Sequence, residues 1–292
     1  MTWRTALADG LHGLSPRAHL VFPSEQRTDL RHRLGRYRRW EDGVDLSPPL
    51  RRAGEMIGPP DFVGIGVMMA GVRWWYHLVA DHPGISTRGG IPMDRHFLSH
   101  FATRSFGAEQ VAQYHGWFPR RPGTITGEWS PSYAALPWVA ELLARAAPDA
   151  RLLLLLRNPI ERFRLGLAQS SENRGSQVGT HVADAMERGF YGAQLGRVLE
   201  FFPAGQVLVL QHECCVADPV AQLALTYRFL GLDDSHRPPR IGPRNVEAER
   251  SIPTADPDAV RRLVGVYAGD VKELAAMVPS LDLSWWPEFA DG

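Results

Sequence analysis

The stretch DFVGIGVMMAGVRWWYHLVADHP, residues 61–83, has the pattern of a strand, a short loop and a helix. Residues 62–67 are apolar and partly β-branched, which predicts a buried strand. Residues 72–82 carry aromatic and aliphatic side chains at helical spacing. A loop in this position normally aims backbone N–H groups and a helix N-terminus at an anion, and it usually carries a lysine and hydroxyl residues. Here the loop is Met68-Met69-Ala70-Gly71, which has neither.

Two further stretches repeat the pattern of a buried strand followed by a helix. ARLLLLLRNPIERF, residues 150–163, holds five consecutive leucines between two arginines, and Asn-Pro then turns the chain into a helix. GQVLVLQHE, residues 205–213, predicts another buried strand, followed by a helix that ends at Gly231. Strands that alternate with helices imply an α/β protein, a three-layer sandwich with a central parallel sheet and right-handed crossovers.

A shorter strand is expected within GTITGEWSPSYAAL, residues 123–136. We expect it to turn into a helix capped by Ser130 or Ser132 and ending near Pro148. A last helix is expected over residues 257–278.

Residues 1–58 are rich in arginine and have weak helical periodicity. They predict an N-terminal helical extension, and residues 59–292 then form the α/β domain. Of the 292 residues, 44% are hydrophobic, which is enough to form a core. Basic and acidic residues number 32 each, and this balance argues against a general nucleic-acid or polybasic membrane binder. Lys272 is the single lysine, so a cation that grips phosphate here must be arginine.

The cysteine content and the N-terminus predict the compartment. Cys214 and Cys215 are adjacent, and such neighbours rarely form a disulfide and cannot build a zinc site alone. This fits a reducing cytosol. The N-terminus lacks the long apolar core of a signal peptide, and the apolar run at 152–156 is too short to span a bilayer. We therefore expect a cytoplasmic protein with a small-molecule substrate and with no nucleic-acid or membrane partner.

The motifs of the chain stand in an order that resembles the PAPS-dependent sulfotransferases, especially their bacterial and heparan-sulfate-type branch. RLLLLLRNPIERFRLGL is similar to that family's strand–turn–helix, which typically reads Leu-Arg-Asn-Pro-x-x-Arg and then a serine. GEWSPSY is similar to its Gly-Glu-x-(Ser/Thr)-Pro-x-Tyr, and MDRHFL to its Lys-Glu-x-His-Phe-Phe. ERGFYGAQL and VLVLQHE also match blocks of the family. The resemblance covers roughly residues 60–290 and implies a P-loop-like sulfotransferase fold.

The resemblance implies a site for transfer of a sulfuryl group from 3′-phosphoadenosine-5′-phosphosulfate (PAPS) without a metal. Glu128 matches the catalytic glutamate and His96 a histidine on the acceptor side. Arg157 matches the arginine that binds the 3′-phosphate, with Tyr191 and Arg250 also on the nucleotide. From the residues alone, Glu128 is also compatible with an acid stabilised by a helix dipole, and His96 with a structural histidine. Arg157 is also compatible with a surface ion pair to Glu161, although its place between a strand and a helix favours an anion contact.

The donor-binding positions depart from the family pattern. Aligned on Ala70-Gly71 and on Trp74-Trp75, the family's lysine position is Met69, its threonine position is Val72 and the next hydroxyl is Arg73. The serine that follows Arg157 by eight residues is Leu165, and acidic Glu247 and Glu249 stand near the expected 3′-phosphate. One lost charge-assisted contact in a preorganised site costs about 2.7–4 kcal/mol of barrier. Several such losses predict a degraded donor site.

Three hypotheses follow. The first is a repurposed sulfotransferase fold that acts on a hydroxylated, apolar small molecule by donor-free acid/base chemistry, such as a cyclisation or elimination, with Glu128. The second is a working PAPS-dependent sulfotransferase in which Arg73 replaces the lysine, since arginine binds phosphate bidentately. The third is a non-catalytic interaction protein whose tryptophans form an interface. The tryptophans considered are Trp74, Trp75, Trp117, Trp129, Trp285 and Trp286.

Overall fold

A computed structural model describes residues 46–87, 93–172, 178–242 and 256–290, with the side chains of 169–180 left aside. Of the predicted N-terminal extension, residues 1–45 lie outside this range. Residues 46–58 contain no helix, and Met56 forms an antiparallel bridge with Arg120.

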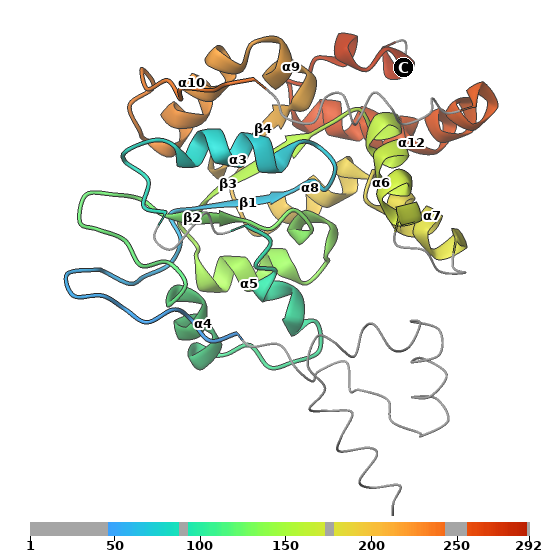
Figure 1. Cartoon of the computed structure of the whole chain (residues 1–292). Helices are drawn as coiled ribbons and strands as arrows, with labels where there is room; N and C mark the ends of the chain where they lie inside the picture. Colours follow the sequence, from blue (N-terminus) through green and yellow to red (C-terminus); the bar gives the residue numbers. More distant parts are fainter. Residues whose placement is uncertain (1–45, 88–92, 173–177, 243–255, 291–292) are drawn as a thin grey trace, which may run out of the picture. The chain divides into compact units, whose positions relative to one another are not determined.

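Strands and helices alternate along the described chain (Figure 1). In chain order the elements are β1 (Phe62–Gly66), α3 (Val72–Ala80), η2 (Phe97–Phe101), α4 (Ala108–His115), β2 (Gly127–Trp129), η3 (Tyr133–Ala135), α5 (Val139–Ala146), β3 (Arg151–Leu156), α6 (Pro159–Glu172), α7 (Val178–Glu187), α8 (Tyr191–Leu199), η4 (Ala204–Gln206), β4 (Val207–Gln211), α9 (His212–Ala217), α10 (Pro219–Leu230), α12 (Pro257–Met277), η5 (Leu283–Trp285) and η6 (Pro287–Phe289). Within these residues no helix is both long and apolar enough to cross a membrane.

The four strands form one parallel sheet in the order β2-β1-β3-β4, so the predicted central parallel sheet is confirmed. Val63 of β1 pairs with Glu128 on one side and with Leu152 on the other. All five residues of β1 are buried, as are the five leucines of β3. Such apolar runs are expected when helices cover both faces of a parallel sheet.

Helices lie on both faces of the sheet, with α3 and α10 on one side and α5 on the other (Figure 1). The Tyr227 hydroxyl of α10 donates to the Leu78 carbonyl of α3 at 2.8 Å and ties the two helices together. Helix α12 packs against α8, whose first-turn N–H groups at Gly192 and Ala193 donate to the Asp270 carboxylate, both at 2.8 Å. The N-terminus of α8 is therefore already occupied by a carboxylate.

One element differs from its prediction. The helix expected after Ser130 is split into the single turn η3 and the separate helix α5. Leu136, which precedes Pro137, has ψ 113° and is extended, because proline disfavours the helical region for the residue before it. Neither serine caps a helix by a side-chain hydrogen bond. The Ser130 hydroxyl accepts from the His96 backbone N–H and donates to the Glu128 carboxylate, and the Ser132 hydroxyl bonds to His96 Nδ1.

Candidate active site

The parallel strands bring four segments to one edge of the sheet. The carboxyl ends of β1, β2, β3 and β4 are followed by residues 67–71, 130–132, 157–158 and 212–213. Ligands of open α/β sheets bind outside the carboxyl ends of the strands, so this edge is where a site is expected. Within the described residues, three non-glycine residues have φ in the left-handed region: Met69, Asp94 and His96. Such backbone is unfavourable for L-residues and gathers at functional sites.

The loop between β1 and α3 retains the backbone of an anion site. Gly71 has φ 78° and precedes Val72, the first residue of α3, and no side chain caps this helix. A Cβ on Gly71 would lie 2.8 Å from Nδ1 of His212, so the close approach also needs glycine. The first N–H groups of a helix have no partner within it, and they favour negative charge.

The side chains of this loop contribute little polarity. Ala70 and Val72 are buried, and Met69 is half-buried. Trp74 is buried, and its indole N–H donates to the Ile241 carbonyl at 2.9 Å, so this donor is already used within the protein. Leu165, at the family's serine position, is 6% exposed and packs in the core.

Arg157 lies beside the loop, as the sequence predicts for an anion contact. Its guanidinium is largely buried, and Nη1 is 3.5 Å from the Met69 carbonyl oxygen, which is long for a hydrogen bond. The buried Tyr191 hydroxyl donates to the Arg157 carbonyl at 2.9 Å, so Tyr191 orients the backbone of this arginine. Arg250, Glu247 and Glu249 lie outside the described residues.

Two residues that the sequence analysis did not select complete this edge. Burial, and then the charge of Arg157, lower the pKa of His212 to about 4. The imidazole is therefore neutral near pH 7. Glu213 accepts hydrogen bonds from the Asn158 backbone N–H at 2.8 Å and the Trp286 indole at 3.1 Å, and burial raises its pKa. His212 and Glu213 directly follow a predicted buried strand, and this position in the sequence could have marked them as site residues.

A second group of polar residues stands at the mouth of the site. The Arg73 guanidinium forms an ion pair with Asp94 at 2.8 Å, and these side chains are 69% and 40% exposed. His96 Nε2 lies 3.9 Å from the Asp94 carboxylate, and Nδ1 lies 2.8 Å from the Ser132 hydroxyl. Burial lowers the pKa of His96, whereas Asp94 raises it. Arg73, Asp94 and His96, here called the mouth cluster, combine a cation, a carboxylate and a neutral imidazole.

Glu128 has a different environment from the mouth cluster. It is 0% exposed, and its two carboxylate oxygens accept hydrogen bonds from three hydroxyl groups. The donors are Tyr114 at 2.7 Å, Ser130 at 2.8 Å and Tyr133 at 3.2 Å. Burial raises the pKa of Glu128, and the hydrogen bonds oppose that effect. Its catalytic role stays a prediction. In this structure the carboxylate has no exposed surface that a substrate could touch.

Asp94 is the carboxylate that sequence reasoning missed. It occupies the second position of MDRHFL, where the similar family motif has glutamate, two residues before His96. That acidic position was the signal available in the sequence. The four tryptophans Trp74, Trp75, Trp129 and Trp286 are at most 7% exposed, which leaves Trp285, at 42%, as the clearly exposed member of the interface hypothesis. Within the described residues, no group of three or more His, Cys, Asp or Glu side chains could hold a metal.

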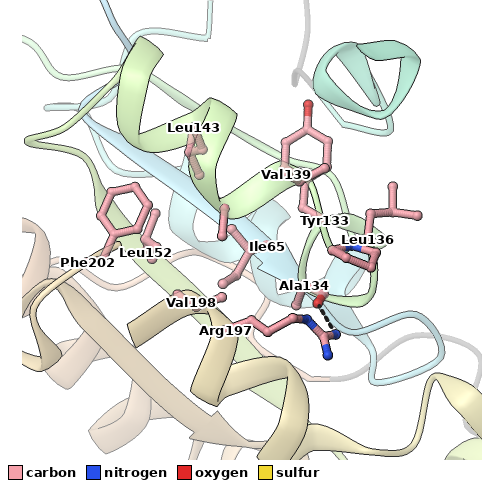
Figure 2. Close-up of a pocket in the computed structure, with 12 residues that line it drawn as sticks. Ile65, Tyr133, Ala134, Leu136, Val139, Leu143, Leu152, Arg197, Val198 and Phe202 are labelled. Atoms are coloured by element: carbon pink, nitrogen blue, oxygen red, sulfur yellow. Dashed lines mark hydrogen bonds between the residues drawn. The ribbon is translucent and has the colours of Figure 1, made fainter. Parts of the chain in front are cut away.

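Two neighbouring cavities open near η3. The first is apolar, lined by residues such as Ile65, Leu143, Leu152 and Phe202, with Arg197 at its edge (Figure 2). Its volume is about 10 Å³, at most the space of one water. The second has a volume of about 240 Å³ and is lined by charged as well as apolar side chains from η3, the end of α7, and α8.

Comparison with known proteins adds independent information. A family model described as the sulfotransferase family matches residues 92–236. Mouse heparan sulfate glucosamine 3-O-sulfotransferase 6 is 28% identical over 187 residues, covering 59% of this chain and 52% of that protein. Mouse heparan sulfate glucosamine 3-O-sulfotransferase 3B1 is 28% identical over 188 residues, covering 59% and 46%. The chain belongs to the sulfotransferase family. It spans about half the length of the curated relatives it matches.

Solved sulfotransferases share the fold. A sulfotransferase from Alicyclobacillus acidocaldarius superimposes with a TM-score of 0.62 at 23% identity, over 79% of this chain and 100% of that one. The sulfotransferase domain from the curacin biosynthetic pathway gives a TM-score of 0.50 at 11% identity, over 77% and 99%. The predicted P-loop-like sulfotransferase fold is thus confirmed. The family uses PAPS as its donor. Of the groups implied to bind that donor, the α3 N-terminus and Arg157 suit an anion. The apolar side chains of Met69, Val72 and Leu165 do not.

Proposed function

We propose that this sulfotransferase-family chain is an enzyme that acts on a hydroxylated, largely apolar small molecule and binds PAPS weakly. Sulfuryl transfer is then impaired, or replaced by donor-free acid/base chemistry such as a cyclisation or elimination. Asp94, assisted by His96, receives the proton of the substrate hydroxyl. The observation that carries this proposal is the ion pair between Arg73 and Asp94 at 2.8 Å. Arg73 is the one cationic side chain of residues 69–73, and its charge is paired with Asp94 instead of being free for a phosphate.

The mouth cluster supports acid/base chemistry. A general base needs to come within hydrogen-bond reach of the proton it removes, and Asp94 is 40% exposed. His96 is neutral near pH 7 because burial lowers its pKa, so its ring is able to accept a proton. The Ser132 hydroxyl at Nδ1 fixes the orientation of the ring.

The donor side supports weak nucleotide binding. Val72 and Leu165 are 7% and 6% exposed, so the positions that carry hydroxyls in the family belong to the core here. Met69 supplies neither charge nor a hydrogen-bond donor. Backbone N–H groups and Arg157 remain, and these bind an anion without the lysine contact.

A calorimetric titration with adenosine 3′,5′-bisphosphate, the nucleotide product of the donor, tests this proposal. We expect the natural chain to bind with a Kd weaker than micromolar. Met69→Lys restores a cation at the loop, and we expect it to tighten binding roughly tenfold or more. Met56→Lys adds the same charge at an exposed methionine outside the site and should leave the affinity unchanged. Micromolar or tighter binding by the natural chain would overturn the proposal.

A second candidate is a working PAPS-dependent sulfotransferase in which Arg73 replaces the lysine. It is favoured by the place of Arg73 in the first turn of α3 and by its 69% exposed side chain. In that reaction the acceptor oxygen bonds to sulfur, and the bond from sulfur to the phosphate oxygen breaks. The proton passes to Asp94, and adenosine 3′,5′-bisphosphate leaves. Arg73→Ala then abolishes both nucleotide binding and turnover, and an unchanged affinity in that variant excludes this candidate.

A further inference from the structure

The larger cavity beside η3 has the lining of a binding pocket. Its volume of about 240 Å³ suits one substituted ring or one end of a longer molecule. Leu136 and Phe190 supply apolar surface, and Arg188 and Arg197 supply cations, with Asp184 and Glu187 at the same wall. The apolar cavity next to it, shown in Figure 2, holds about 10 Å³ and is too small for such a ligand.

Arg188 has an unmet hydrogen-bonding requirement at this cavity. Its Nε donates to Asp184 at 2.8 Å, and the side chain is 22% exposed. Its Nη1 is buried and has no hydrogen-bond partner in the part of the chain that the structure describes. A buried cationic N–H without an acceptor is costly, and in native proteins such a group usually bonds to water or to a ligand.

Arg197 offers a second set of donors on the same wall. Its Nη2 is 3.4 Å from the Ala134 carbonyl, which is longer than an ordinary N–H···O bond (Figure 2). A ligand oxyanion is able to replace so weak a contact. Guanidinium groups bind carboxylates and similar oxyanions through paired hydrogen bonds.

From this juxtaposition we infer that the cavity is the substrate pocket and that Arg188 and Arg197 bind an oxyanion, a carboxylate or a sulfo group, carried by the hydroxylated substrate. The inference rests on the proposed function and narrows its substrate class to acidic molecules with an apolar body. Asp184 and Glu187 balance the two arginines, so recognition depends on hydrogen bonds to the oxyanion more than on net charge.

Two features link the cavity wall to the mouth cluster, namely the charge of Arg188 and the short segment from Ser132 to Ala135. The charge of Arg188 acts on His96 and contributes to lowering its pKa. Ala135 of the cavity wall follows Ser132 by three residues, and the Ser132 hydroxyl is 2.8 Å from His96 Nδ1. A substrate held at its acidic end by Arg188 therefore extends toward His96 and Asp94.

Binding of four matched phenols tests the inference without a donor and without turnover. The probes are 4-hydroxybenzoate, 4-hydroxybenzenesulfonate, the neutral 4-hydroxybenzamide and the cationic 4-hydroxybenzylamine, titrated by calorimetry or NMR at fixed ionic strength. We expect one or both anions to bind the natural chain roughly tenfold or more tighter than the amide. Comparison of the two anions identifies the preferred oxyanion.

Arginine variants locate the effect. Arg188→Gln or Arg197→Gln should bring the affinity for the preferred anion down to that for the amide. Arg228→Gln removes another arginine that pairs with an acid, outside the cavity lining, and should keep the preference. If one variant fails to fold in a thermal melt, the other decides.

Four results overturn the inference. They are equal binding of anion and amide, tighter binding of the amine, no binding of any probe at millimolar concentration, and an anion preference that survives both substitutions. None of them changes the result of the nucleotide titration, so the inference and the proposed function fail separately.

Discussion

Glu128 and Asp94 lie on adjacent stretches of backbone and yet in opposite surroundings. The Asp94 N–H donates to the carbonyl of Trp129 at 3.0 Å, one residue after Glu128. Glu128 is 0% exposed inside a cage of the Tyr114, Ser130 and Tyr133 hydroxyls, whereas Asp94 is 40% exposed and contacts Arg73. A raised pKa marks candidate catalytic acids, but an acid also needs an accessible oxygen. The difference favours a structural role for Glu128 and supports the proposal that Asp94 is the base.

The largest effect is expected on turnover. Measuring it tests directly whether Asp94 or Glu128 is the base. Asp94→Asn removes the proposed base and should lower turnover by roughly 10²–10⁴-fold, the usual contribution of a general base. The assay incubates hydroxylated acceptors with and without PAPS and detects products by mass spectrometry. Its matched variant is Glu128→Gln, measured in the same assay on folded protein. A loss of turnover confined to Glu128→Gln would reverse the roles of the two carboxylates.

The next effect is on stability. Glu128→Ala leaves three buried hydroxyl groups without their acceptor, and we expect it to lower the free energy of unfolding by about 3–5 kcal/mol. Denaturant unfolding followed by circular dichroism measures this change. Glu109→Ala, at an exposed position of α4, should change stability by less than about 0.5 kcal/mol. Equal midpoints for the two variants would mean that the cage around Glu128 contributes no net stability.

The pH dependence of stability sharpens the description of the Glu128 cage. Burial raises the pKa of Glu128 in the folded chain above its usual value of 4.5. The folded state then binds the proton more tightly than the unfolded state, so this group's contribution to stability is fully present below pH 4.5 and is lost as pH rises through the folded pKa. Relative to Glu128→Gln, the natural chain should lose stability as pH is raised from 4.5 toward 8. A constant difference between the two chains across that range contradicts the raised pKa.

The smallest effect is expected at the mouth cluster. The ion pair of Arg73 and Asp94 is exposed, and such pairs contribute at most about 1 kcal/mol. Arg73→Ala should therefore leave the unfolding midpoint nearly unchanged and reduce the salt dependence of stability slightly. A destabilisation as large as that of Glu128→Ala would show that the mouth cluster holds the fold together as well.

The fold was predictable because its strands depend on local pattern. The leucine run at 152–156 and the apolar segment at 62–66 predict buried strands whatever surrounds them, and the helices beginning near Val72 and Pro257 follow from periodicity. The helix predicted after Ser130 was wrong because one proline outweighed the pattern around it. Local pattern therefore specified the sheet but not the details of its edge.

The candidate site was predictable only in part, because burial at a strand end depends on residues far away in sequence. Arg157 and the 69–73 loop are brought together as the motif order implied. The closure around Glu128 requires the Tyr114 hydroxyl of α4, a contact that no local pattern contains. The two arginines of the cavity lie on α8 and just beyond α7, so only the tertiary fold places them at one wall.

The packing of Trp129 against β1 limits which positions of the strand can be changed to strengthen donor binding. A Cβ on Gly64 would lie 2.0 Å from the Trp129 ring, and the indole N–H donates to the Gly66 carbonyl at 3.2 Å. Laboratory evolution of donor binding therefore has no room for a side chain at Gly64. A library that leaves residues 62–66 untouched and randomises Met68, Met69 and Arg73 directs its diversity to two half-buried positions of the loop and one exposed position of α3.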